Sequence, residues 1–222
     1  MRGHPSGWPQ RFSGPVKAYV YVDGLNLYYG AVKDTPYKWL NLAELCRLLL
    51  PRDEIVQIKY YRAIVDARPE DPHAPTRQQF YLRALRTIPN LSIYFGHFLT
   101  QKRWLPLVFP NKNGPKKVQV YKTEEKGSDV NLGTHLVRDG FRQEYEVAVL
   151  ITNDSDLLEP IRVVRHELGL PVGILNPHPK PSAALLPHLN FIKQIRRGLL
   201  ARCQFPSTLT DKEGAFSKPS NW

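Results

Sequence analysis

Four aspartates of this chain stand where ordinary surface charge is seldom found. Asp23 ends the apolar run KAYVYVD, and Asp154 and Asp156 follow the apolar run VAVLIT. Asp129 lies at the start of a predicted helix, in the segment KGSDVNL. Short apolar runs are typical of strands buried on both faces of a parallel sheet. Carboxylates at the carboxyl ends of such strands lie at the crevice where α/β sheets bind ligands.

Carboxylates that share one crevice repel one another unless a cation joins them. Hard cations such as Mg²⁺ and Mn²⁺ take oxygen ligands, which is what four aspartates offer. We therefore predict a divalent-metal site of the kind that handles phosphates. Asp23 and Asp154 are the predicted direct ligands, whereas Asp129 and Asp156 would bind a second ion or orient waters.

The overall charge points to the same class of substrate. The chain of 222 residues has 31 Lys and Arg against 20 Asp and Glu, a formal net charge of +11. A polyanionic partner explains a basic surface together with an acidic metal cluster. The alternative is that the basic residues serve solubility alone. The charge and the four aspartates together favour a nucleic acid.

Other features limit the class of protein. The two cysteines, Cys46 and Cys203, have no metal or redox spacing, and we expect Cys46 to be a buried thiol on a helix. The sequence contains no apolar run long enough to span a bilayer. The first residues, MRGHPSGWPQRFSG, lack the apolar segment of a signal peptide. We therefore expect a cytoplasmic protein with no membrane contact.

Strands and helices alternate along the chain, which predicts a single α/β domain. We expect a doubly wound, mostly parallel central sheet with helices on both faces, over residues 16–204. Flexible tails are expected at 1–15 and 205–222. The predicted strands are 17–22, 54–65, 91–98, 118–123, 147–152 and 171–176. The main predicted helices are 41–50, with Asn41 as N-cap, 76–88, 128–141 and 156–169.

The segments VDGLNL, KGSDVNL and TNDSDL together resemble the NYN domain, a branch of the PIN-like metal-dependent nucleases. All three motifs occur in the family's order, and the resemblance spans residues 17–195. It implies a PIN-like fold and hydrolysis of RNA phosphodiester bonds with Mg²⁺ or Mn²⁺. It also implies that the acidic set is Asp23, Asp129, Asp154 and Asp156. One departure concerns Asn153, since the family often has Gly there, and this residue bears on substrate preference.

Four further residues are candidates for supporting roles around the metal. Asn26 either positions a metal-bound water or holds the loop after the first strand. Lys126 either contacts the scissile phosphate or is an ordinary surface lysine. Asn153 could narrow the site or add a hydrogen bond, and Ser155 is a candidate for local hydrogen bonding.

The segment 100–117 is predicted to be a basic loop or hairpin arm. Basic groups follow phosphates, and aromatic faces stack on unpaired bases. A solvated hairpin without a nucleic-acid role is the alternative. The candidate nucleic-acid-binding residues are Lys102, Arg103, Trp104, Lys112, Lys116, Lys117 and Lys122.

We therefore predict a metal-dependent endoribonuclease that acts on single-stranded or structured RNA. The first alternative is an RNA-binding NYN-like module with weak or no catalysis, acting through a partner. The second is a nuclease or phosphatase for DNA or small phosphate esters. The sequence contains no glycine-rich P-loop, which argues against nucleoside triphosphate hydrolysis of that type. It does not specify an oligomeric state or a protein partner.

Overall fold

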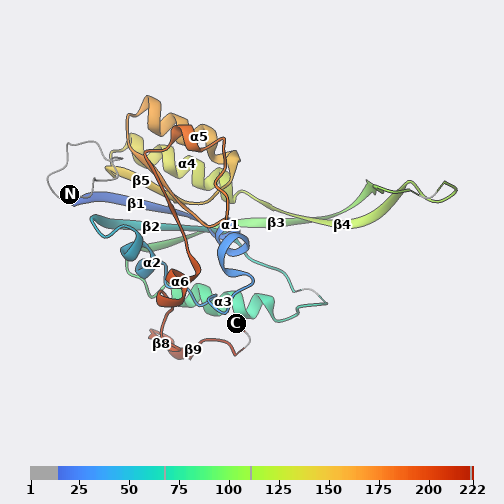
Figure 1. The fold of residues 1–222 in the computed structure, drawn as a ribbon. Helices are drawn as coiled ribbons and strands as arrows, with labels where there is room; N and C mark the ends of the chain where they lie inside the picture. The colour runs from blue at the N-terminus through green and yellow to red at the C-terminus, as the bar shows by residue number, and fades with distance from the viewer. Residues whose placement is uncertain (1–14, 68, 111, 221) are drawn as a thin grey trace.

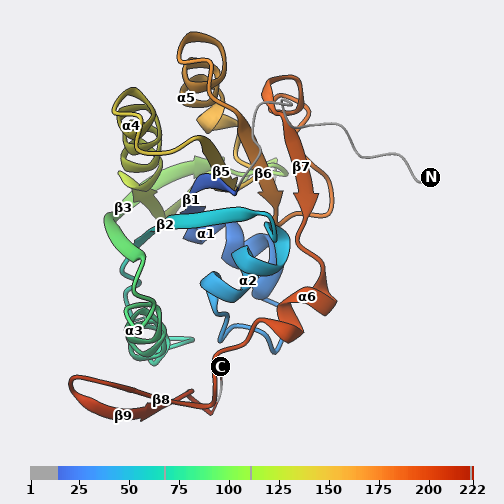
Figure 2. The same ribbon diagram turned by 90° about the vertical axis from the view of Figure 1, so that its left-hand side faces the viewer.

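A computed structural model of the chain describes residues 15–67, 69–110, 112–220 and 222. A seven-stranded sheet runs through the molecule in the order β4-β3-β2-β1-β5-β6-β7 (Figures 1 and 2). All neighbours pair in parallel except β3 and β4, which are antiparallel. Its strands are β1 (Val16–Asp23), β2 (Asp53–Ala63), β3 (Leu91–Pro106), β4 (Lys117–Lys126), β5 (Val147–Ile151), β6 (Val172–Asn176) and β7 (Phe191–Gln194).

Helices cover both faces of the sheet, as expected for a doubly wound fold (Figure 2). One face carries α4 (Ser128–Phe141) and α5 (Leu158–Arg162). Around α5, a 3₁₀ turn (Ser155–Leu157) precedes the helix and a π-helical turn (Val163–Glu167) follows it. The other face carries α1 (Gly24–Leu27), which continues as a π-helical turn (Tyr28–Val32), together with α2 (Leu42–Leu49), α3 (Ala74–Leu85) and α6 (Arg197–Arg202).

The central strand β1 is buried on both faces of the sheet, which is why its sequence is a nearly continuous apolar run. Val20 and Val22 face the core beneath α2 and α3, while Tyr21 between them packs against α4. All three side chains are buried because successive side chains of a strand point to opposite faces of the sheet. The mostly parallel α/β architecture predicted from the sequence is confirmed.

Local signals placed several helices correctly. The Asn41 side chain accepts hydrogen bonds from the backbone N–H groups of Ala43 (3.0 Å) and Glu44 (3.2 Å), and it therefore caps α2 as predicted. Glu44 does not complete a capping box, because its carboxylate is paired with Arg47 at 2.7 Å. Cys46 is buried on this helix, as expected.

Strands β3 and β4 form the predicted arm, and β3 extends well beyond the expected residue 98. The two strands pair from His97–Lys126 out to Pro106–Lys117. Figure 1 shows this twisted ribbon projecting away from the sheet and its helices. A two-stranded ribbon has no layer of its own to cover it, so most of its side chains are exposed.

The C-terminal residues differ from the expected tail over 205–222. β8 (Thr208–Asp211) and β9 (Gly214–Ser217) form a hairpin, and a bidentate ion pair joins Arg83 of α3 to Asp211, with both contacts at 2.7 Å. Phe216 is buried, with its ring 6.5 Å from that of Trp39. This segment therefore completes the core beneath α3. The tail expected at 1–15 lies outside the described residues except for residue 15.

Strand β7 was also absent from the expected strands. It pairs with β6 through Gly173, where the Phe191 ring occupies the space that a Cβ would fill, at 2.1 Å from it. No helix in the described part of the chain combines the length and apolar character needed to cross a bilayer.

Candidate metal centre

Three of the four predicted aspartates converge at the carboxyl edge of the sheet. One carboxylate oxygen from each of Asp23, Asp129 and Asp154 lies within 4.8 Å of the others. Asp23 ends β1, Asp154 follows β5, and Asp129 lies in the first turn of α4. Strands β1 and β5 are neighbours from which the connections run to opposite ends of the sheet, which is the position where open α/β sheets bind ligands.

Asp23 is held by its own loop and by the loop that follows β5. Its side chain is the N-cap of α1 and accepts a hydrogen bond of 2.9 Å from the backbone N–H of Asn26. The Thr152 hydroxyl donates a second bond of 3.1 Å to the other carboxylate oxygen. Asp23 is only 5% exposed, and these two bonds fix the orientation of its carboxylate.

The two loops are tied to each other by a short chain of hydrogen bonds. The backbone N–H of Asn153 donates to the Asn26 side chain at 2.9 Å. The backbone N–H of Asp154 donates to the Thr152 hydroxyl at 3.1 Å, and that of Asp156 donates to the Asp154 carboxylate at 2.9 Å. Asn26 therefore holds the loop after β1, which is one of the two roles considered for it.

Burial and mutual repulsion favour the protonated form of these acids. Burial raises the pKa of Asp23 to about 7, and the charges of Asp129 and Asp154 add to this, against the bonds from Asn26 and Thr152. Burial also raises the pKa of Asp129, followed by repulsion from Asp154, Glu125 and Asp156. A cation placed among these carboxylates would relieve both effects.

No lysine, arginine or histidine of the described residues forms an ion pair with these three carboxylates. Asp139 on α4 shows the opposite arrangement, although it is buried as Asp23 is. Its carboxylate accepts from Lys59 at 2.5 Å, from Tyr21 at 2.7 Å and from Arg138 at 2.8 Å. The unneutralised acids are therefore gathered at the sheet edge.

Asp156 and Ser155 lie on the exposed side of this edge. Asp156 is not one of the three clustered carboxylates, although its charge still raises the pKa of Asp129. Both residues belong to the 3₁₀ turn that opens the segment leading to α5. Their positions are compatible with contacts to solvent or substrate near the edge of the site.

Asn153 fixes a second loop beside the site. Its side-chain amide donates to the Lys180 carbonyl at 3.0 Å, and its amide oxygen accepts from the Ser182 backbone N–H at 2.6 Å. A glycine at this position would make neither bond. The asparagine therefore ties the segment after β6 to the loop that carries Asp154.

Lys126 and Glu125 point in different directions at the end of β4. Lys126 is exposed and pairs with Glu124 at 2.9 Å. The Glu125 side chain is only 7% exposed, accepts from the backbone N–H of Ala63 at 2.8 Å and is also hydrogen-bonded to the Ser128 hydroxyl. Glu125 thus anchors the start of the helix that carries Asp129.

A close backbone crossing positions Asp129 relative to the arm. A Cβ on Gly96 of β3 would lie 2.5 Å from both the Lys126 carbonyl oxygen and the Ser128 hydroxyl. Gly127 has a φ of 86°, in the left-handed region that favours glycine. These two glycines allow β3 to pass directly against the turn into α4.

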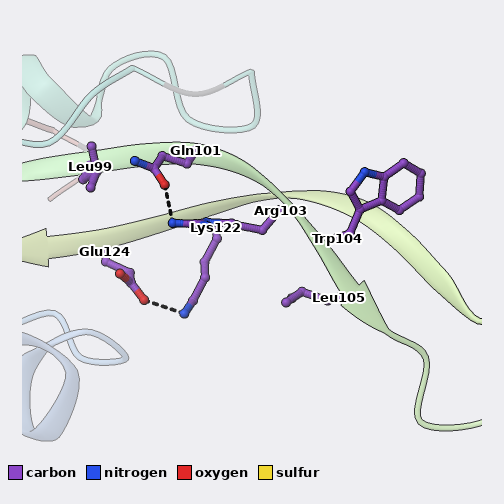
Figure 3. A pocket seen from close by; sticks show the side chains of 7 residues that line it. All are labelled: Leu99, Gln101, Arg103, Trp104, Leu105, Lys122 and Glu124. Carbon is purple, nitrogen blue, oxygen red and sulfur yellow. Dashed lines mark hydrogen bonds and ion pairs between the residues drawn. The ribbon is translucent and has the colours of Figure 1, made fainter.

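The predicted nucleic-acid-binding residues lie on the β3–β4 arm or its tip and are exposed. The Lys102 ammonium lies 5.7 Å from the Tyr121 ring centroid, and Trp104 is 63% exposed. Figure 3 shows a shallow pocket on the arm, in which Lys122 is paired with Glu124 at 2.5 Å and Arg103 donates to Gln101 at 2.6 Å. Lys112, Lys116 and Lys117 belong to the outer end of the arm. Figure 1 shows the outer part of the arm projecting away from the sheet and its helices.

Arg62 and Asp139 are buried charged residues that were not among the predicted site residues. Arg62 is a charged residue next to the end of an apolar strand, the same signal that identified Asp23. Asp139 follows Leu132 by seven residues and Leu136 by three, so it lies on the inward face of α4. Both were detectable as charges at positions that the pattern marks as buried.

Comparisons with known proteins show the family of the chain and match its fold. The family model described as "NYN domain" matches residues 17–192. A protein of Pseudomonas putida named 6-hydroxy-3-succinoylpyridine 3-monooxygenase HspA is 28% identical over 239 residues, which cover 95% of this chain and 76% of that protein. A crystal structure of VPA0982 from Vibrio parahaemolyticus, described as a protein of unknown function, aligns with a TM-score of 0.55 at 15% identity. This alignment covers 84% of this chain and 97% of that chain.

Proposed function

We propose that this chain, which belongs to the NYN domain family of the PIN-like nuclease superfamily, hydrolyses RNA phosphodiester bonds with a divalent cation. Membership of the family supports a nuclease-like function. The observation that carries the proposal is the convergence of Asp23, Asp129 and Asp154 at the sheet edge, with no ion pair to these carboxylates among the described residues.

The three carboxylates fit Mg²⁺ or Mn²⁺. Both ions prefer oxygen ligands, and both accept a site in which water and substrate phosphate complete the coordination. Asp23, Asp129 and Asp154 would hold the ion. Such an ion neutralises charge on the phosphate and lowers the pKa of an attacking water.

The surrounding residues keep these ligands in place. Thr152 and the backbone of Asn26 hold Asp23, and the backbone N–H of Asp156 holds Asp154. We propose that the Asp156 carboxylate orients solvent or a second ion at the exposed side of the site. Lys126, which is exposed at the start of the turn into α4, is proposed to contact the substrate phosphate when it is released from Glu124.

The arm is proposed to bind the RNA strand outside the reaction centre. Its lysines and Arg103 would follow the phosphates, and Trp104 would stack on an unpaired base. The exposure of all these side chains supports this role. Ser155 and Asn153, next to Asp154, are proposed to shape the entry of the strand into the crevice.

The proposal is tested by incubating the purified protein with labelled single-stranded RNA, structured RNA and DNA. Each substrate is tested with Mn²⁺, with Mg²⁺ and with EDTA, and Asp154→Asn serves as the matched variant. Metal-dependent cleavage of RNA by the wild type but not by the variant is expected. Binding of RNA without cleavage under every metal condition would instead support an RNA-binding module, and cleavage of DNA alone would support the second alternative.

A different activity is suggested by the name of the Pseudomonas putida protein. Its similarity extends over 95% of this chain, which makes oxidation of a hydroxypyridine a second candidate function. The direct test is to offer 6-hydroxy-3-succinoylpyridine with a reduced nicotinamide cofactor and oxygen. A hydroxylated product formed by the wild type, together with no cleavage of RNA, would replace the nuclease proposal.

A further inference from the structure

Arg62 is a buried arginine at the same edge of the sheet as the three carboxylates. It lies one residue before the end of β2, and β2 pairs with β1 in a register that places Tyr61 opposite Asp23. Its side chain is only 9% exposed. The guanidinium carbon lies 5.7 Å from the centroid of the Tyr28 ring, in the helical segment that directly follows Asp23.

The guanidinium of Arg62 lacks the hydrogen bonds that a buried arginine normally makes. Its Nη1 atom is buried without a partner among the described residues. The nearest acid is Glu125, whose Oε2 atom lies 3.8 Å away and is also without a hydrogen-bond partner. The other oxygen of Glu125 is already engaged by Ala63 and Ser128. The ion pair is therefore loose, while Glu125 itself is firmly fixed.

This arrangement is unfavourable unless a ligand completes it. A buried charged group that lacks hydrogen bonds is costly, because the interior replaces none of its lost hydration. A guanidinium presents donors in a planar fork that matches two oxygens of a phosphate. Arg62 lies between Tyr28, which follows Asp23 on one side, and Glu125, which precedes Asp129 on the other.

We propose that Arg62 binds a non-bridging phosphate oxygen of the RNA strand, on the nucleotide next to the bond held at the three carboxylates. This inference rests on the proposed function, since it assigns part of the same substrate. The guanidinium lies over the Tyr28 ring, and its Nη1 atom lies 3.8 Å from the Glu125 carboxylate. Arg62 is thus a substrate-binding residue that sets where the strand lies relative to the metal centre.

The competing explanation is that Arg62 only neutralises Glu125. A pair of variants separates the two roles. Arg62→Gln removes the proposed phosphate contact but also leaves Glu125 unpaired. The double variant Arg62→Gln/Glu125→Gln removes both charges, so its net charge equals that of the wild type. Arg86→Gln is the control for loss of one positive charge, because Arg86 is exposed and precedes β3, at the opposite edge of the sheet.

The experiment measures binding of a fluorescent single-stranded RNA dodecamer by anisotropy, in EDTA and at several salt concentrations. Cleavage is then measured separately with Mn²⁺, and near-UV circular dichroism checks the fold of each variant. We expect both Arg62→Gln and the double variant to bind at least about tenfold more weakly than wild type, the size of a lost charge-assisted hydrogen bond. The salt slope should fall by about 0.7, the value for one phosphate contact on a single strand.

The outcomes distinguish this inference from the proposed function. Wild-type affinity in the double variant would overturn the phosphate role, whether or not Arg62→Gln alone folds. Affinity in Arg62→Gln equal to that of Arg86→Gln would overturn it as well. If the wild type binds RNA through Arg62 but cleaves none with any metal, the proposed hydrolysis fails and the binding role stands. If the wild type cleaves RNA and the double variant binds and cleaves RNA as well as the wild type does, the phosphate role of Arg62 fails. The proposed hydrolysis then stands.

Discussion

Asp23 and Asp139 are two buried aspartates that the protein treats in opposite ways. Asp139 is surrounded by Lys59, Arg138 and Tyr21, and these hydrogen bonds lower the pKa of its carboxyl against the effect of burial. Asp23 has two hydrogen bonds and two neighbouring carboxylates, and burial raises its pKa to about 7. In the first site, the chain neutralises Asp139 with its own Lys59 and Arg138. In the second site, no lysine, arginine or histidine among the described residues pairs with Asp23 or with its two neighbouring carboxylates.

The largest expected difference concerns stability without metal. Asp139→Asn should lower the free energy of unfolding by about 3–5 kcal/mol, because it leaves Lys59 buried without its partner. Asp23→Asn should leave the stability unchanged or raise it, since it removes a repelling charge. Urea denaturation in EDTA measures both. A loss of similar size in the two variants would show that the contrast between the sites is wrong.

The next prediction concerns chemistry at the metal centre. Asp154→Asn should reduce RNA cleavage by at least about a hundredfold, the scale of losing one preorganised charge-stabilising group. The fold should persist, because an amide oxygen can still accept the bond from Asp156 N–H. Asp156→Asn, just outside the three-carboxylate cluster, is the matched comparison and should lose less. Equal cleavage by wild type and Asp154→Asn would remove this residue from the site.

A divalent cation should stabilise the protein through the site of Asp23 and not through the site of Asp139. A cation that binds the folded state at about 100 times its Kd adds about 2.7 kcal/mol. For a chain of this size the melting temperature should rise by about 5–10 °C. Asp23→Ala should reduce that rise, whereas Asp139→Asn should keep it. A melting temperature indifferent to millimolar Mn²⁺ in the wild type would contradict a preformed metal site.

The two acids should also respond oppositely to pH in the absence of metal. The raised pKa of Asp23 gives a contribution to stability that is fully present below about pH 4 and is lost as the pH rises through about 7. The lowered pKa of Asp139 gives a contribution present above about pH 4 and lost as the pH falls. Melting curves of Asp23→Asn and Asp139→Asn from about pH 2 to about pH 8 should each lose one of these dependences, the Asp139 dependence below about pH 4 and the Asp23 dependence above it. Saturating Mn²⁺ should suppress the Asp23 dependence in the wild type.

The arm should affect affinity and have the smallest effect on the reaction itself. Replacing Lys112, Lys116 and Lys117 with Glu should weaken binding of single-stranded RNA and lower its salt slope by about 2, since fewer counterions are released. Cleavage at saturating RNA should change by less than about twofold, because the arm does not contribute to the three-carboxylate cluster. An unchanged salt slope would make the arm a solvated hairpin.

The sequence predicted those parts of the molecule in which burial and chemistry coincide. Asp23 and Asp154 were found because apolar strands precede them, and the parallel topology then brought them together. Asp139 was missed because an acid inside an amphipathic helix resembles surface charge until its helical phase is compared with Leu132 and Leu136. The partners of such an acid are set by packing between distant elements, which a single sequence does not reveal.

The C-terminal hairpin was missed for a different reason. Residues 205–222 are polar and contain no long apolar run, so local patterns predict a tail. Their position depends on a few contacts distant in sequence, including the bidentate pair of Arg83 with Asp211 and the burial of Phe216. Contacts of this kind fix a segment without giving it an internal pattern. Strand β7, with four residues, is likewise too short to produce a clear alternation.

The crossing at Gly96 links the length of the arm to the geometry of the site. On the outer side of this crossing the ribbon is paired only with itself, so its strands can gain or lose residues in matching pairs while each side chain keeps its face. On the inner side a single added carbon would meet the backbone that leads to Asp129. Related proteins should therefore differ in the length of the arm. The residues at its base, where β3 crosses the turn into α4, should vary little. The arm can thus change in length while the geometry of the three carboxylates stays constant.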